Sequence, residues 1–123
     1  MWTINPYCFY QCTNLEQVTL SKNLLSLHEE VFEECVNLKQ ILLPERLRWI
    51  EHACFKESGL ESVSFPDSVN RLDIRAFHRC RSLQEIVFGK GSNLRLVGYG
   101  AFSECTALAT VAFPKSFTYS QPE

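Results

Sequence analysis

Apolar side chains recur along this chain at intervals of about 23 residues. The clearest column consists of phenylalanines separated by 23, 23, 22 and 25 residues: Phe9, Phe32, Phe55, Phe77 and Phe102. A leucine column keeps nearly the same spacing: Leu15, Leu38, Leu60, Leu83 and Leu108. Self-similarity at a fixed period of this length is typical of a stacked repeat protein.

Further columns run in step with these two. One column of small residues contains four cysteines and one serine: Cys12, Cys35, Ser58, Cys80 and Cys105. Four more columns are wholly apolar and begin at Met1, Ile4, Val18 and Leu20. A single unit cannot bury so many apolar positions alone, whereas stacked units bury each column as a continuous ridge.

Each unit contains a short alternating segment that predicts a half-buried strand. We expect five parallel strands in one sheet, at 17–20, 40–43, 62–65, 85–88 and 110–113. In three units a proline follows the strand and ends it, because proline cannot donate to the ladder: Pro44, Pro66 and Pro114.

The remainder of each unit predicts shorter elements. Phe32 and Cys35 have i, i+3 spacing, which favours about two helical turns over 29–35 with Phe32 pointing inward. Residues 47–50 could form a second short extended segment. The expected fold is therefore an α/β repeat solenoid with strands on one side and helical turns on the other.

The columns divide the chain into five units and a tail. The unit boundaries fall at 1–23, 24–46, 47–68, 69–93 and 94–114. Residues 115–123 are either the degenerate start of a sixth unit or a tail, since Phe117 falls near the first column but Ser120 is polar where the next column requires an apolar residue.

The residue pattern of the units resembles the BspA-like leucine-rich repeats of bacterial and protist surface antigens. Residues 47–66, LRWIEHACFKESGLESVSFP, show the A/C-F-x-x-C/S turn and the terminal proline of that family. The resemblance implies a right-handed curved solenoid with a parallel sheet on its concave side. It also implies adhesive or recognition roles, often at a cell surface or after secretion.

Composition excludes several kinds of partner. The chain has 12 basic and 14 acidic residues and a formal net charge of −2, which does not favour nucleic acid or an anionic membrane. Its apolar runs are shorter than the roughly 18 residues that a membrane helix needs, and its first residues do not resemble a signal peptide. We therefore expect no nucleic-acid binding and no membrane insertion.

The six cysteines fit the repeat better than they fit a metal site or a disulfide framework. Four stand in the small-residue column, and Cys8 and Cys54 share another, just before the phenylalanine. Buried free thiols suit both columns, although a disulfide or a metal remains an alternative. The three histidines, His28, His52 and His78, fall in three different columns, so we expect no metal and no cofactor.

Nothing in the sequence marks a catalytic set of nucleophile, base and orienting group, so we expect no enzymatic activity. The loop Gly89–Asn93 contains Gly-Lys-Gly but lacks the spacing of a phosphate-binding loop. It is better explained as a loosened turn that replaces proline, with Lys90 exposed.

The strands predict a recognition surface on the concave face. Two columns flank the buried strand residues and point outward; we call them the outward columns: Gln17, Gln40, Ser62, Glu85 and Thr110, then Thr19, Leu42, Ser64, Val87 and Ala112. Glu85 is their single formal charge, which suits a protein or peptide better than a polyanion. The sequence therefore predicts a protein-binding or adhesion module.

Two other surfaces remain possible. The second unit is acidic at Glu29, Glu30, Glu33 and Glu34, and the fourth is basic at Arg71, Arg75, Arg79 and Arg81. Such charges usually only solvate a face, but they could support end-to-end or lateral self-association. Trp49 is expected to be partly exposed on the side opposite the sheet, in a packing role.

Overall fold

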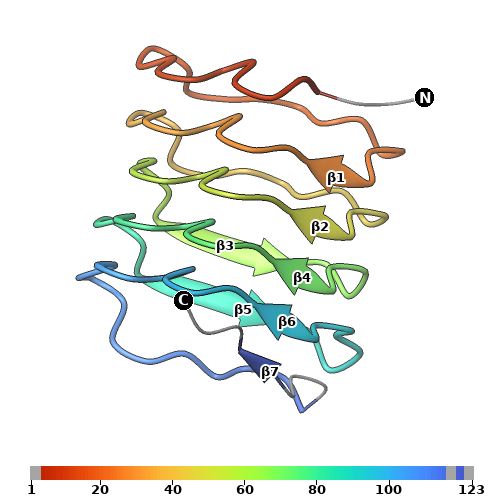
Figure 1. Ribbon diagram of the computed structural model, residues 1–123. Coiled ribbons are helices and arrows are strands. Elements are labelled where there is room, and N and C mark those ends of the chain that lie inside the picture. The colour runs from red at the N-terminus through yellow and green to blue at the C-terminus, as the bar shows by residue number, and fades with distance from the viewer. Residues whose placement is uncertain (1–3, 116–118, 121–123) are drawn as a thin grey trace.

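A computed structural model describes residues 4–115 and 119–120. The chain winds through successive units that stack on one another, with equivalent segments side by side (Figure 1). Five two-residue strands form one parallel sheet, in the order β1 (Ser26–Leu27), β2 (Trp49–Ile50), β4 (Arg71–Leu72), β6 (Leu96–Val97) and β7 (Tyr119–Ser120). A second parallel sheet contains β3 (Ser62–Phe65) and β5 (Glu85–Phe88). The fold is a leucine-rich-repeat solenoid.

The predicted row of five strands is only partly correct. Two of the five segments, β3 and β5, pair in register from Ser62↔Glu85 to Phe65↔Phe88. Residues 17–20, 40–43 and 110–113 run alongside without strand pairing. The ladder forms where the last core column holds two well-stacked rings, since Phe65 and Phe88 lie 4.9 Å apart and nearly parallel.

The sequence did not predict the five-stranded sheet. It indicated one short extended segment at 47–50, which corresponds to β2. The strands of this sheet occur where each unit places the Leu27, Ile50, Leu72 and Val97 column inward, and all four side chains are buried. The residues just before them pair as Ser26↔Trp49↔Arg71↔Leu96. The backbone of Ser120 pairs with Val97, so β7 adds a strand at this edge of the sheet. Phe117 lies outside the described residues.

The predicted helical turns around the phenylalanines are wrong, because the described residues form no helix. In each unit the residues two before and two after the phenylalanine have positive φ, as at Glu30 (57°) and Glu34 (62°) around Phe32. Alternate N–H groups then point to the next unit: Phe32 N donates to the Cys54 carbonyl at 2.8 Å. The intervening groups bond three residues back, so the segment consists of linked turns that satisfy the backbone across units.

The core follows the predicted columns closely. Phe32, Phe55 and Phe77 are fully buried and stack at 5.0–5.2 Å between ring centroids, while Phe9 and Phe102 at the two ends are half-buried. The shortened third unit fits because Gly59 passes very close to the previous turn. A Cβ at Gly59 would lie 2.0 Å from the Val36 carbonyl oxygen, which no other residue could accommodate without a shift.

Candidate functional site

The outward columns lie on the solvent side of the β3/β5 row. Nine of their ten residues are exposed, and Ser62 is half-buried. Within the ladder, Val63 and Phe65 point into the core while Ser64 and Val87 are paired partners on the opposite side. This alternation arises because successive residues of a strand face opposite sides of the sheet, as we expected from the sequence.

The outward columns carry two large exposed apolar side chains. Leu42 is 87% exposed and Val87 is 43% exposed. The remaining members are small or uncharged, except for Glu85. Hydroxyl and amide groups can donate and accept hydrogen bonds with a peptide backbone, and the exposed Leu42 and Val87 offer apolar contact.

The first two units add hollows to this surface. A hollow of about 360 Å³ separates residues 17–19 from residues 40–42, and four outward residues line it: Gln17, Thr19, Gln40 and Leu42. A neighbouring groove of about 590 Å³ extends from Thr19 and Leu42 to Pro44 and Arg46. The structure thus brings together the outward residues of the first two units around concave space.

The basic residues of the fourth unit are largely paired within the chain. Glu104 lies 3.3 Å from Arg79 Nε and 3.9 Å from an Arg81 nitrogen. Arg75 lies over the Tyr99 ring, 5.9 Å from its centroid. Much of the basic charge predicted for this turn is therefore balanced by the fifth unit.

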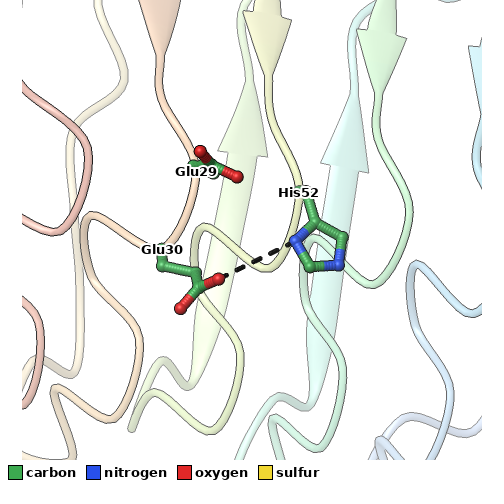
Figure 2. Close-up of side chains that lie close together, drawn as sticks. All are labelled: Glu29, Glu30 and His52. Carbon is green, nitrogen blue, oxygen red and sulfur yellow. Dashed lines mark ion pairs between the residues drawn. The ribbon is translucent and has the colours of Figure 1, made fainter.

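The acidic residues of the second unit lack such cationic partners. Among the described residues, only His52 forms an ion pair with them, at 4.0 Å from Glu30 (Figure 2). Glu33 is 7% exposed, and burial and the nearby Glu30 carboxylate raise its pKa to about 7. The sequence alone did not indicate that one of these four glutamates is buried.

Three of the side chains in this region could offer ligand atoms to one cation. The carboxylates of Glu29 and Glu30 and a ring nitrogen of His52 lie within 4.8 Å of one another. Figure 2 shows them coming from two neighbouring turns. Exposed acidic groups commonly gather without a metal, and this cluster alone does not establish a site. The other two histidines pair elsewhere: His28 with Glu51 at 3.0 Å, and His78 with Ser103.

The serine–histidine contacts do not form a nucleophilic arrangement. Ser103 donates its hydroxyl proton to the Gly100 carbonyl at 3.1 Å, so the hydroxyl is used inside its own turn. Ser26 donates to Glu51 Oε2 at 2.6 Å, and the same oxygen contacts His28. Ser26 and the His78 contact of Ser103 each join neighbouring units, and both hydroxyl protons are donated to acceptors other than a histidine.

The cysteines are all free thiols in the structure. Cys35, Cys80 and Cys105 donate to the carbonyls of Phe9, Phe55 and Phe77 in the preceding unit, at 3.0–3.1 Å. The expectation of burial fails for the first unit, where Cys8 is exposed and Cys12 half-buried. No unit covers the outer side of these two residues in the described structure.

The Gly89–Asn93 loop wraps around a carboxylate of its own chain. A Cβ at Gly89 or Gly91 would lie 2.6 Å from one of the Asp67 carboxylate oxygens, and Asn93 donates twice to the Asp67 carbonyl. The two glycines therefore make room for Asp67. This contact supports the turn interpretation over a phosphate-binding one, and Lys90 is exposed as expected.

No helix in the described residues is long and apolar enough to cross a bilayer. A family model described as "BspA type Leucine rich repeat region (6 copies)" matches residues 2–123. No curated protein has significant sequence similarity to the chain.

Three solved structures share the fold. A leucine-rich repeat protein from Bacteroides ovatus is 24% identical with a TM-score of 0.77; the match covers 98% of this chain and 37% of that protein. The pneumococcal vaccine antigen PcpA is 21% identical with a TM-score of 0.68, over 84% of this chain and 26% of that protein. The T. pallidum leucine-rich repeat protein TpLRR is 24% identical with a TM-score of 0.70, over 88% and 61%. None of these matches indicates a catalytic family.

Proposed function

This chain belongs to the family of BspA-type leucine-rich repeat proteins, and from that membership we propose that it binds a protein or peptide through the outward columns without catalysing a reaction. Solvent exposure supports the proposal, because a coherent, nearly uncharged surface runs across all five units and presents Leu42 and Val87. Adhesion to a protein surface is the role that such a face serves best. Because the chain spans 37%, 26% and 61% of the three solved relatives, this role concerns the described units alone.

The shape of this face favours an extended peptide segment as the part of the partner that is recognised. The hollow beside Gln17, Thr19, Gln40 and Leu42 can accept a side chain, while the hydroxyl and amide groups reach a peptide backbone. The neighbouring groove adds Val18, Leu20 and Leu43 as apolar lining.

The proposal is tested with a peptide selected from a random display library on the immobilised chain. Leu42→Glu and Val87→Glu should each raise the Kd of that peptide at least about tenfold, because each places a charge in an apolar contact. Both side chains are exposed, so the fold should persist, as circular dichroism would verify.

The matched control is Arg75→Glu, an exposed position outside the outward columns. It should leave the Kd unchanged. If Arg75→Glu and Arg79→Glu weaken the peptide while Leu42→Glu and Val87→Glu do not, the turn face is the binding surface and the proposal is wrong.

A structural role is the second candidate, and the end units favour it. Phe9 and Leu15 at one end, and Phe102 and Leu108 at the other, are only half-buried, so each end offers a partly open apolar ridge. A segment that only continues a longer solenoid would yield no peptide that depends on Leu42 and Val87. Longer versions of the chain would instead gain stability with each added unit.

A further inference from the structure

Two oppositely charged surfaces lie on this molecule, away from the outward columns, and each has one ion pair within the described residues. The first, which we call the acidic patch, consists of Glu29, Glu30 and Glu34 in the turn after β1. Among the described residues, no lysine or arginine nitrogen approaches these carboxylates within 4 Å; their contacts are with Gln11, Tyr7 and His52. Tyr7 and Tyr10 flank the patch and are 50% and 38% exposed.

The second surface, which we call the arginine row, consists of Arg48, Arg71 and Arg95 at the beginnings of β2, β4 and β6. Arg48 and Arg95 are exposed, and neither forms an ion pair among the described residues. Arg71 lies between them over the Trp49 ring, 5.8 Å from its centroid, with Asp73 at 3.9 Å. Neighbouring strands are about 4.8 Å apart, so the backbone positions of the row span about 10 Å.

The arginine row was not evident in the sequence, because its residues fall in two different columns. Arg48 and Arg95 occupy one column, and Arg71 occupies the next. Only the pairing of β2, β4 and β6 brings the three to the beginnings of neighbouring strands. The basic turn that the sequence did suggest is instead paired with Glu104 and Tyr99.

The two surfaces cannot meet within one chain. The turns lie at one edge of the stack, and the loops that lead into β2, β4 and β6 lie at the opposite edge (Figure 1). The acidic patch and the arginine row are therefore separated by the length of a unit. A second molecule can bring them together.

We propose that a second copy of this chain docks its acidic patch on the arginine row. Planar guanidinium groups pair well with carboxylates, often through two parallel hydrogen bonds. The exposed tyrosines beside the patch, and Trp49 and Leu25 beside the row, add apolar contact. This contact uses none of the outward columns, so it is independent of the proposed recognition function.

The contact is heterologous, because each copy contributes a different surface. Each bound copy keeps one unused patch and one unused row, so assembly continues into chains or closes into a ring. Screening should weaken it, since the Debye length falls from about 30 Å at 0.01 M salt to about 3 Å at 1 M.

Sedimentation velocity on two charge-neutral variants tests the proposal. The first variant combines Glu29→Gln, Glu30→Gln and Glu34→Gln, and the second combines Arg48→Gln and Arg95→Gln. At about 0.01 M salt the unaltered chain should self-associate, and each variant alone should associate at least about 100-fold more weakly. An equimolar mixture of the two variants should form a dimer and nothing larger, because only one complementary pair of surfaces remains.

Matched controls change the same number of charges elsewhere. Glu16→Gln with Glu45→Gln and Glu61→Gln, and separately Lys39→Gln with Lys90→Gln, alter exposed residues outside both surfaces. Both controls should associate like the unaltered chain. A monomeric unaltered chain at low salt, a variant that still assembles alone, or a mixture that stays monomeric would each overturn the proposal.

Discussion

Glu33 is buried, whereas the other three glutamates of its turn are at least partly exposed. Glu33 as a whole residue is 7% exposed, and Lys56 of the next unit only partly offsets the effect of burial and of the neighbouring carboxylates on its pKa. With a pKa of about 7, the folded chain binds a proton at Glu33 more tightly than the unfolded chain does, where the pKa is near 4.5. Glu33 therefore favours the folded state at low pH and loses this contribution as the pH rises through 7.

Replacing Glu33 by Gln should remove this pH dependence. At about pH 8 the Glu33→Gln chain should be more stable by roughly 1 kcal/mol, less than the full pKa shift implies because water screens the neighbouring carboxylates. Below about pH 4.5 the difference should vanish, since Glu33 is then protonated in both states. Urea unfolding across this pH range measures the difference, and a constant difference at every pH would contradict the assignment.

At the scale of elements, the phenylalanine stack couples the units. Phe77 is fully buried and contacts three rings: Phe55 at 5.0 Å, Phe102 at 5.4 Å and the edge of Phe65 at 5.6 Å. Phe9 is half-buried and has one stacking partner, Phe32 at 5.5 Å. The two rings occupy the same column but differ in what surrounds them.

The cost of removing a ring should therefore depend on its position in the stack. Phe77→Ala should lower the free energy of unfolding by about 3–5 kcal/mol, and Phe9→Ala by about 1–2 kcal/mol, because the end ring loses less buried area and leaves an open surface instead of a cavity. Denaturant titrations of both variants give the comparison. Equal losses would show that the end unit is as well enclosed as the centre.

The linked turns illustrate how an element can satisfy a side-chain pattern without the expected backbone. The i, i+3 spacing of Phe32 and Cys35 correctly placed both side chains inward, and both are buried. It did not distinguish a helix from consecutive turns, because both bring residues three apart onto one face. Consecutive turns form instead of a helix because their N–H groups bond to the neighbouring unit. For example, Glu34 N donates to the Lys56 carbonyl at 2.8 Å.

At the scale of the whole molecule, the cysteine side chains are more exposed to solvent in the first unit than in the later units. Cys8 is exposed and Cys12 is half-buried, whereas the cysteines of the later units are buried: Cys35, Cys54, Cys80 and Cys105. Burial raises the pKa of Cys35 to about 11 and also raises the pKa of Cys54, so little reactive thiolate forms at neutral pH.

Thiol labelling followed by mass spectrometry should resolve this gradient. In the native chain Cys8 should react first and Cys12 more slowly, while the four buried thiols stay unmodified until the stack opens. All six should react after denaturation without a reductant. Fewer than six would reveal a disulfide, and early modification of Cys54 would show that the central units open readily.

The sequence alone determined the repeat and the inward columns, because each unit must bury the same apolar positions, which therefore recur at the same interval. It also indicated the parallel stacking and which residues of β3 and β5 face outward. The tertiary structure decided which strands form ladders, that the turns adopt positive φ, that Glu33 is buried, and that Arg48, Arg71 and Arg95 stand at the beginnings of neighbouring strands. These features depend on hydrogen bonds and charges of groups about 23 residues away along the chain. Such contacts between units cannot be read from the sequence of a single unit.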